Sequence, residues 1–286
     1  MSAVTKAIIP VAGYGTRRLP LTKAIEKSML PIGDRPLVDY AVADCIQAGI
    51  KDIYFVINRT LGDTTQIETY YGKNSLLAEF LADRKASEKL AKLQTAPEDV
   101  RFHFVVQDPN KQYGTAVPVA LVLAAAERGE VPAIGADESV AFANGDDFFW
   151  DGKSSEMANL LAGVAEGEAA TMPIARKESE MPSFGMVEVA DGYMTGLVEK
   201  PELAAVTSNL ANTNRFVFCP KLLQMIAEYV KTHDFSPLEQ EYMITDPILE
   251  FIRQGGKIKV VPAKSEWLDG GSLDGWFYAN QVVLGK

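Results

Sequence analysis

The stretch "KAIIPVAGYGTRRLPLTKAIEKSMLP", residues Lys6 to Pro31, joins a short apolar run to a basic loop that carries glycines. The run from Lys6 to Ala12 predicts a buried strand, because a short continuous apolar segment closed by glycine is typical of a parallel sheet covered on both faces. Four basic residues follow it in the loop: Arg17, Arg18, Lys23 and Lys27. Positive charge concentrated directly after a buried strand indicates a small bound anion.

The remainder of the chain is acidic, so the positive charge of this loop is local. The 286 residues contain 28 Lys and Arg against 38 Asp and Glu, a formal net charge of −10. This balance argues against nucleic acid as a partner, because a sequence-independent grip on nucleic acid needs a basic surface. No segment approaches the ~20 apolar residues of a membrane span, and the N-terminus lacks a signal-peptide pattern, so we expect no membrane partner. Cys45 and Cys219 lie in apolar runs without metal-ligand spacing, which predicts reduced, buried thiols and a cytoplasmic protein.

Strand and helix signals alternate after the loop and predict an α/β fold. Helical spacing of apolar residues after Pro36, followed by the apolar run "DIYFVIN", completes a strand–helix–strand unit. Beyond it we expect strands over 101–107 and 139–149 and helices over 75–93, 115–128, 221–231, 244–253 and, capped by Ser272, 273–284. We therefore expect a single domain built on a Rossmann-like, mixed but mainly parallel sheet flanked by helices.

The glycines of "GYGTRR" complete neither of two common phosphate-binding motifs. A dinucleotide fingerprint needs a third glycine where Arg18 stands, and a P-loop needs Lys and then Ser or Thr directly after Gly15. What remains is a glycine-rich turn whose backbone N–H groups can face an anion, with Arg17 and Lys27 able to contact phosphate oxygens. This pattern favours a polyphosphate ligand, and the alternative is a solvated basic turn.

Two acidic positions indicate a metal site. Asp146 and Asp147 close the strand predicted over 139–149, and because neighbouring side chains of a strand point to opposite faces, only one of them faces the ligand crevice. Asp269 stands far downstream in "EWLDGGS", before two glycines. Two carboxylates from distant segments are enough to hold a Mg²⁺ ion that keeps water and substrate phosphates as its other ligands. Each aspartate alone is also typical of a turn or a cap.

The loop "GYGTRRLPLTKAIEKSMLP" resembles the signature loop of the sugar-1-phosphate nucleotidyltransferase family, GxGTRxxPxTKxxPKxMLP, and the similarity extends over nearly the whole chain. Within this family the chain is similar to the bacterial UTP–glucose-1-phosphate uridylyltransferase branch. The similarity to that branch rests on "PLVDYAVADCIQAGI", the charged insertion near 75–93, "VEKP", "SNLA" and "ITDPI". The resemblance implies the nucleotide-diphospho-sugar transferase fold, with a nucleotide-binding half of about residues 1–150 and a sugar-binding half of about residues 151–286.

The resemblance also implies roles for individual residues. Arg17 and Lys27 match the catalytic residues that engage the nucleotide phosphates. The positions that match nucleotide-binding residues are Ala12, Gly13, Gly15 and Thr16, together with Gln107 and Gly114, which match those that read the pyrimidine edge. Gly185 and Glu199 match contacts to sugar hydroxyls, Lys200 matches the lysine that holds the sugar phosphate, and Asp146 and Asp269 match the metal-binding pair for Mg²⁺.

The activity implied by the resemblance is transfer of a uridylyl group from UTP to glucose 1-phosphate, giving UDP-glucose and pyrophosphate by in-line attack on the α-phosphorus. It also implies a homo-oligomer, either a dimer or a tetramer. Two alternatives stay open: a thymidylyltransferase that makes dTDP-glucose from dTTP, because "GDD" and "WLDGGS" resemble that branch, and a non-catalytic regulator that binds sugar nucleotides. A nicotinamide-dependent dehydrogenase is disfavoured by the missing third glycine.

Two positions depart from the pattern of the uridylyl branch. Glu26 stands where that branch usually has proline, directly before Lys27, and an acidic neighbour can dampen or reposition a lysine. Asn214 replaces the glycine of the "GRY" motif.

Overall fold

The computed structural model describes residues 4–59, 62–72, 75–108, 110–236 and 240–285. The α-helices in this part of the chain are α1 (Leu37–Gln47), α2 (Gln66–Tyr71), α3 (Ser75–Asp83), α4 (Ser87–Ala91), α5 (Val117–Glu127), α6 (Glu156–Gly163), α7 (Pro220–Thr232), α8 (Thr245–Arg253) and α9 (Leu273–Leu284). Short 3₁₀ turns occur at η1 (Thr16–Arg18), η2 (Leu21–Lys23), η3 (Lys27–Met29), η4 (Glu178–Ser183) and η5 (Leu203–Ala205).

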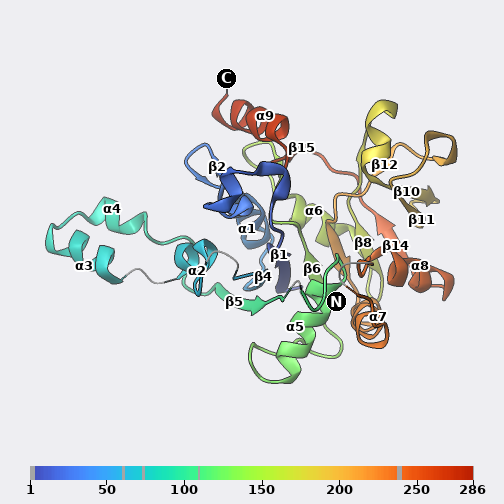
Figure 1. Ribbon diagram of the computed structural model, residues 1–286, viewed down its shortest axis with the longest axis horizontal. Helices are drawn as coiled ribbons and strands as arrows, with labels where there is room; N and C mark the ends of the chain where they lie inside the picture. The colour runs from blue at the N-terminus through green and yellow to red at the C-terminus, as the bar shows by residue number, and fades with distance from the viewer. Residues whose placement is uncertain (1–3, 60–61, 73–74, 109, 237–239, 286) are drawn as a thin grey trace.

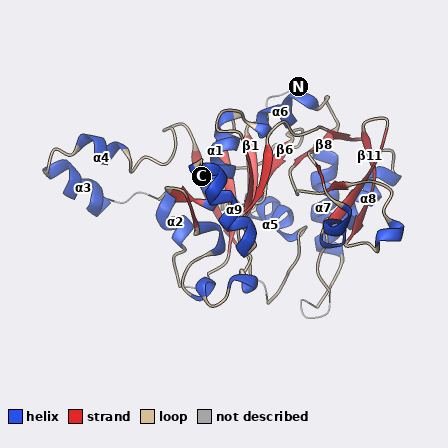
Figure 2. Cartoon of the chain, turned by 90° about the horizontal axis from the view of Figure 1, so that it is seen from above, coloured by secondary structure: helices blue, strands red, loops and turns tan. Residues whose placement is uncertain are grey.

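A large mixed sheet runs through the centre of the molecule (Figures 1 and 2). In spatial order its strands are β5 (Arg101–Val106), β4 (Asp52–Ile57), β1 (Lys6–Pro10), β6 (Val140–Phe142), β13 (Phe216–Phe218), β8 (Ala169–Thr171), β14 (Ile258–Val260), β11 (Tyr193–Glu199), β10 (Gly185–Ala190), β12 (Leu210–Ala211) and β9 (Ile174–Ala175). The strands from β5 to β6 are parallel to one another, whereas the half that begins at β13 contains mostly antiparallel pairs. Two small antiparallel ladders join β2 (Pro31–Ile32) to β3 (Arg35–Pro36) and β7 (Asp147–Trp150) to β15 (Glu266–Asp269).

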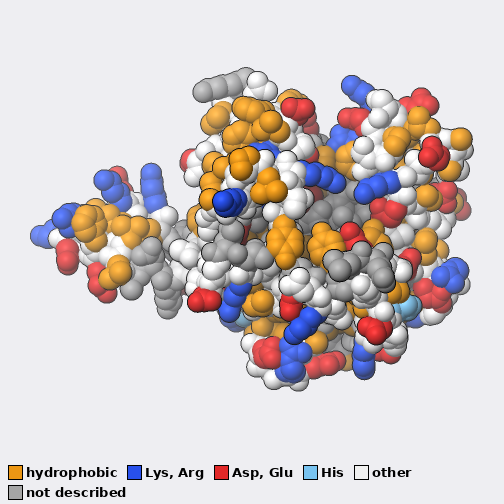
Figure 3. Space-filling model, viewed as in Figure 1, with side chains coloured by type: hydrophobic (Ala, Val, Ile, Leu, Met, Phe, Trp, Pro, Cys, Tyr) orange, Lys and Arg blue, Asp and Glu red, His pale blue; other side chains and the backbone are white. Residues whose placement is uncertain are grey.

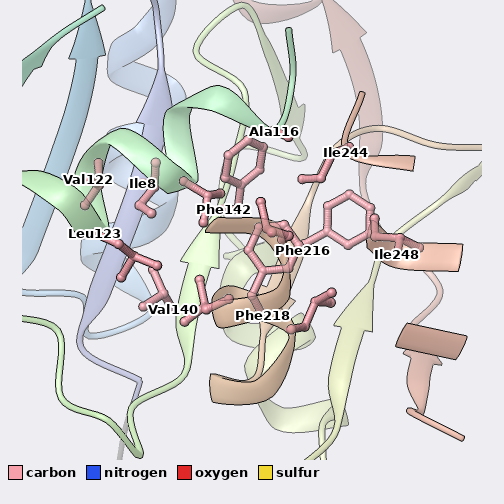
Figure 4. Packing of buried hydrophobic residues seen from close by; sticks show 14 of the residues in the cluster. Ile8, Ala116, Val122, Leu123, Val140, Phe142, Phe216, Phe218, Ile244 and Ile248 are labelled. Carbon is pink, nitrogen blue, oxygen red and sulfur yellow. The ribbon is translucent and has the colours of Figure 1, made fainter. Parts of the chain in front are cut away.

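Helices cover both faces of the sheet, which explains why its central strands read as continuous apolar runs. Helices α1 and α6 pack on one face, and α5, α7 and α8 pack on the other. Successive side chains of β13 point to opposite faces of the sheet. Phe216 and Phe218 enter the hydrophobic cluster beneath α5 and α7 (Figure 4), while Val217 enters the cluster beneath α6. Each such buried side chain stabilises the fold by about 1.5–3 kcal/mol.

The predicted fold class, a mixed α/β sheet flanked by helices, is confirmed, but two of the predicted elements are wrong. The strand expected over 139–149 is divided into β6 and β7, because β7 leaves the large sheet to pair with β15. The helix expected over 75–93 is two helices, α3 and α4, separated at Lys85, which has φ 54°. Together α3 and α4 form an arm that projects from the body of the molecule (Figures 1 and 2).

Both cysteines are free and buried, as their sequence context predicts. Burial raises the pKa of the Cys45 thiol to about 12, so the thiol stays protonated at neutral pH. Within the described residues, no helix is long and apolar enough to cross a membrane.

An ion pair joins the N-terminal ends of β4 and β5. Asp52 and Arg101 are register partners, and the Arg101 guanidinium donates to both carboxylate oxygens at 2.8 and 2.7 Å. The ring of His103 lies 2.8 Å from the same carboxylate, whose side chain is 6% exposed. The hydrogen bonds from Arg101 and then from His103 lower the pKa of Asp52 from 3.8 to about 2. The carboxylate therefore stabilises the folded chain at neutral pH.

We predict that Asp52→Asn lowers the free energy of unfolding by about 2 kcal/mol at pH 7. Because folding lowers this pKa, the stabilisation is complete above pH 3.8 and is lost as the pH falls through about 2. Urea unfolding of the two proteins at a series of pH values measures this difference, with the exposed Asp63→Asn as control. A difference that stays constant down to pH 2 would show that the charge of Asp52 is not responsible.

Candidate active site

A pocket of about 250 Å³ opens at the C-terminal ends of β1 and β6, where an open α/β sheet usually binds its ligand. Most of its lining residues come from the β1 loop, the β5–α5 connection and the β6–β7 connection, and two come from the segments before β13 and α8. They include Ala12, Gly13, Lys27, Gln107, Tyr113, Gly114, Asn144, Asp146, Asn214 and Glu241. In the space-filling view the molecule is hollowed between the part that carries α9 and the part that carries β10 and β12, with Lys and Arg side chains at the rim (Figure 3).

The loop after β1 folds back on itself through η1, η2 and η3. Gly15 has φ 62°, a conformation that favours glycine, and a Cβ atom there would lie 3.0 Å from the Cβ of Lys27. Thr22 closes the loop by donating its hydroxyl hydrogen to the Gly15 carbonyl at 2.9 Å. A Cβ atom placed on Gly13 would have no other atom within 4 Å, so open space lies beside this residue. The loop is thus built around the stem of Lys27 and leaves room beside Gly13.

Lys27 and Asp146 form an ion pair inside the pocket, between Nζ and Oδ2. The two side chains are 24% and 30% exposed. Burial alone would lower the pKa of Lys27, but the charge and hydrogen bond of Asp146, with Asp269 and Asp147 nearby, raise it. Lys27 is therefore a cation at neutral pH, and its charge lies inside the pocket.

Asp147 faces away from the pocket and is buried, as strand alternation predicts. Its carboxylate accepts from Asn144 Nδ2 at 3.0 Å and from Trp267 Nε1 at 3.1 Å. Burial and the neighbouring charge of Asp146 raise the pKa of Asp147 above its usual range. Arg215, which is completely buried, lies 3.9 Å from Asp147 and 2.9 Å from Asp44 of α1. This buried group supports the strand that begins directly after Asp146.

Asp269 is brought beside Asp146 by the pairing of β15 with β7. Asp269 is the register partner of Asp147, and the Gly270 N–H donates to the Asp146 carbonyl at 2.9 Å. A Cβ atom at Gly271 would lie 3.0 Å from Asp269 Oδ1, 3.3 Å from Asp146 Oδ2 and 3.8 Å from Lys27 Nζ, so these three groups surround one point.

The donor set around that point consists of two carboxylates. Asp269 also accepts from the N–H of Gly271 and from the hydroxyl of Ser272, as a turn aspartate does. Among the described residues, no cluster of three or more His, Cys, Asp or Glu side chains has the arrangement of a metal site. Two oxygen donors suit a hard divalent cation whose other ligands are water and phosphate.

The opposite wall of the pocket is formed by Gln107 and Gly114. Gln107 is buried and donates from Nε2 to the Gln112 carbonyl at 3.1 Å, which fixes its side chain toward the β5–α5 connection. Gly114 has φ 135°, and a Cβ atom there would lie 2.4 Å from the backbone N and O of Tyr242. The Tyr242 N–H donates to the Tyr113 carbonyl, and the Tyr242 carbonyl accepts from the Ala116 N–H, both at 2.9 Å. Only glycine permits this close approach.

The predicted sugar-binding residues form a second group. Gly185 and Glu199 are register partners on β10 and β11, and Thr245 donates to Glu199 Oε1 at 2.9 Å. Lys200 follows directly, exposed and with φ 42°. These three residues do not line the pocket that holds Lys27 and Asp146.

Four other predicted residues lie outside the pocket lining, among them Asp269 at the end of β15. Gly15 supports Lys27 from behind, whereas Thr16 and Arg17 are exposed in η1. Arg18, by contrast, is buried: it donates to the Ser272 carbonyl at 2.7 Å and lies over the ring of Trp276. One member of the basic cluster therefore attaches the loop to α9.

Several pocket residues have no strong signal in the sequence. Tyr113, Asn144 and Glu241 line the pocket, but nothing in their immediate sequence sets them apart. Asn214 does have a local explanation: its φ of 52° lies in the left-handed region, where asparagine substitutes for glycine more readily than other residues do. Asparagine at this position is therefore compatible with the left-handed backbone that the chain adopts here.

Comparison with known proteins agrees with this geometry. A UTP–glucose-1-phosphate uridylyltransferase of Haemophilus ducreyi is 33% identical over 231 residues, covering 77% of this chain and 75% of that protein. The enzyme of the same name from Escherichia coli K12 is 33% identical over 244 residues, covering 79% and 74%. The solved structure of the UTP-bound UGPase from Acinetobacter baumannii superposes with a TM-score of 0.82 at 26% identity, covering 98% of this chain and 93% of that one.

A family model described as nucleotidyl transferase matches residues 6–285, almost the entire chain. The chain therefore belongs to the nucleotidyl transferase family.

Proposed function

We propose that this protein transfers a uridylyl group from UTP to glucose 1-phosphate, giving UDP-glucose and pyrophosphate. The observation that carries the proposal is the meeting of Lys27, Asp146 and the glycine loop in one pocket with Gln107 and Gly114. The names of the uridylyltransferase relatives and of the UTP-bound structural neighbour support the same reaction.

The chemistry requires positioning and charge compensation more than proton transfer. A sugar phosphate is already an anion at neutral pH, so its oxygen can attack the α-phosphorus in line without a general base. Lys27, with Arg17 from the same loop, would offset the negative charge that grows on the α-phosphate and the pyrophosphate leaving group. The backbone of Ala12, Gly13, Gly15 and Thr16 would hold the triphosphate, and Gln107 and Gly114 would contact the pyrimidine.

The second substrate would bind at the group on β10 and β11. Gly185 and Glu199 would contact hydroxyls of the sugar, and Lys200 would bind its phosphate. Because this group belongs to the half beyond residue 150, we propose that residues 1–150 hold mainly the nucleotide and residues 151–286 mainly the sugar.

Asp146 and Asp269 would hold a Mg²⁺ ion between them. Their oxygens meet around one point beside Lys27, and carboxylates are donors that this ion prefers. When bound, the ion would neutralise phosphate charge that otherwise keeps two anionic substrates apart. Asp146 is also paired with Lys27, so the lysine would lie directly beside an ion held by the two carboxylates.

The thymidylyl alternative is not favoured, because the relatives that match this chain over about three quarters of their length are named as uridylyltransferases. We also propose that the protein acts in the cytoplasm, where its two free cysteines would stay reduced, and that it forms a dimer or tetramer.

The reaction is tested by following pyrophosphate release from the purified protein with Mg²⁺ and matched pairs of nucleotide and sugar phosphate. We expect UTP with glucose 1-phosphate to be used at least about tenfold better, by kcat/KM, than dTTP with the same sugar. Binding of UTP without release of pyrophosphate would instead identify a non-catalytic regulator.

We predict that Lys27→Ala lowers kcat by about 10²–10³-fold, because it removes a positioned cation from the developing phosphate charge. Steady-state pyrophosphate release measures the effect. The control is Lys231→Ala, an exposed lysine on α7, which should leave kcat within about twofold of the wild-type value. Near-normal turnover by Lys27→Ala would remove this lysine from the mechanism.

We predict that Asp146→Asn raises the Mg²⁺ concentration needed for half-maximal activity by at least about tenfold, since it removes a charged ligand. Titration of Mg²⁺ at saturating substrates gives this value for the variant and for Asp137→Asn, an exposed control. An unchanged Mg²⁺ requirement would place the ion elsewhere.

A further inference from the structure

Glu26, the acidic neighbour of Lys27, is held by a residue of α2. The Glu26 N–H donates to Gln66 Oε1 at 2.9 Å, and the Gln66 N–H donates back to Glu26 Oε1 at 2.5 Å. Gln66 Nε2 also donates to the Ala24 carbonyl at 3.3 Å. The carboxylate of Glu26 is thus bonded to the start of α2, and the two residues form a reciprocal pair that we call the Glu26–Gln66 clamp.

The clamp acts on the backbone from which Lys27 projects. Glu26 is the residue before η3, with φ −59° and ψ 135°, and Lys27 is the first residue of that turn. A φ near −65° is the value that a proline ring imposes covalently. Here the same backbone direction is held by hydrogen bonds between Glu26 and Gln66, a residue 40 positions away in the chain.

Lys27 needs such an anchor because its own side chain supplies little rigidity. A lysine amine sits on a flexible four-carbon stem, so its position depends on where its Cα is fixed and on what contacts the stem. Gly15 packs against one side of the stem: a Cβ atom placed on Gly15 would lie only 3.0 Å from the Cβ of Lys27. The clamp fixes the backbone directly before it.

We propose that Glu26 and Gln66 are positioning residues for Lys27, which hold its backbone so that the amine reaches the α-phosphate, and that turnover depends on this clamp more than substrate affinity does. This proposal rests on the proposed function for its effect on turnover. Glu26 then acts through its hydrogen bonds to Gln66, and its charge has no direct part in tuning the lysine.

The proposal is tested with variants that break the clamp in different ways. Glu26→Ala and Gln66→Ala should each lower kcat by about tenfold or more, with KM for UTP changed by less than about threefold, because a small misplacement of a reacting group is costly. Each single variant removes one of the two reciprocal hydrogen bonds: Glu26→Ala removes the bond accepted by Glu26 Oε1, and Gln66→Ala removes the bond accepted by Gln66 Oε1. If the clamp acts as a unit, the double variant should lose less than the product of the two single losses. The exposed Glu98→Ala serves as the control and should match the wild type.

Two rescue variants separate geometry from charge. Glu26→Pro loses the clamp but keeps φ near −65°, and Glu26→Gln keeps an acceptor oxygen but loses the charge. Both should retain kcat within about threefold of the wild-type value. If Glu26→Gln is as impaired as Glu26→Ala, the charge itself acts on Lys27 and the proposal is wrong; additive losses in the double variant would also overturn it.

A measurement on the free protein keeps this test separate from that of the reaction. The rate at which an amine-acylating reagent modifies Lys27, followed by peptide mass spectrometry, requires no turnover. Loosening the clamp should weaken the Lys27–Asp146 pair and raise this rate several-fold in Glu26→Ala and Gln66→Ala, but not in Glu26→Pro. An unchanged rate in the first two variants contradicts the proposal, whereas failure of the wild type to release pyrophosphate contradicts only the proposed function.

Discussion

The ion pair between Lys27 and Asp146 is the contact on which the arrangement of the site depends. It joins the loop after β1 to the connection between β6 and β7, two segments separated by 119 residues in the chain. Each partner is fixed from behind: Gly15 packs against the stem of Lys27, and the Gly270 N–H binds the carbonyl of Asp146. The charges that a phosphate ligand would meet are therefore set by backbone contacts on both sides of the pocket.

Beneath this pair lies a second, buried group of charges whose contribution is geometric. Arg215 is fully buried between Asp44 on α1 and Asp147 on β7. Taking such charges out of water costs about as much free energy as their attraction returns, so the group adds little to stability. Instead, the group connects α1, β7 and the residue before β13. These contacts fix the position of β7, the strand that follows Asp146, relative to the large sheet.

Much of the region around β1 could be predicted from the sequence because its signals are local. The apolar run of β1, its glycine stop and the basic loop lie within one stretch of chain, and the structure places Lys27 of that loop beside Asp146. The division of 139–149 into β6 and β7 could not be predicted, because β7 is defined by a partner strand more than 100 residues away. Tyr113 and Glu241 enter the pocket for a similar reason: the backbone of Tyr242 pairs with the turn at Gly114, and no periodicity in the sequence records that contact.

The ladder between β7 and β15 has a consequence for the order in which the molecule is made. Asp269 follows every strand of the large sheet in the sequence, and it reaches Asp146 only by pairing with a strand that was synthesised more than 100 residues earlier. A nascent chain that has completed β1, β4, β5 and β6 already has its glycine loop and its lysine, yet it lacks the second carboxylate. Assembly of the pair of acids is thus a late event, and a partly synthesised chain carries the basic glycine loop before it carries both carboxylates.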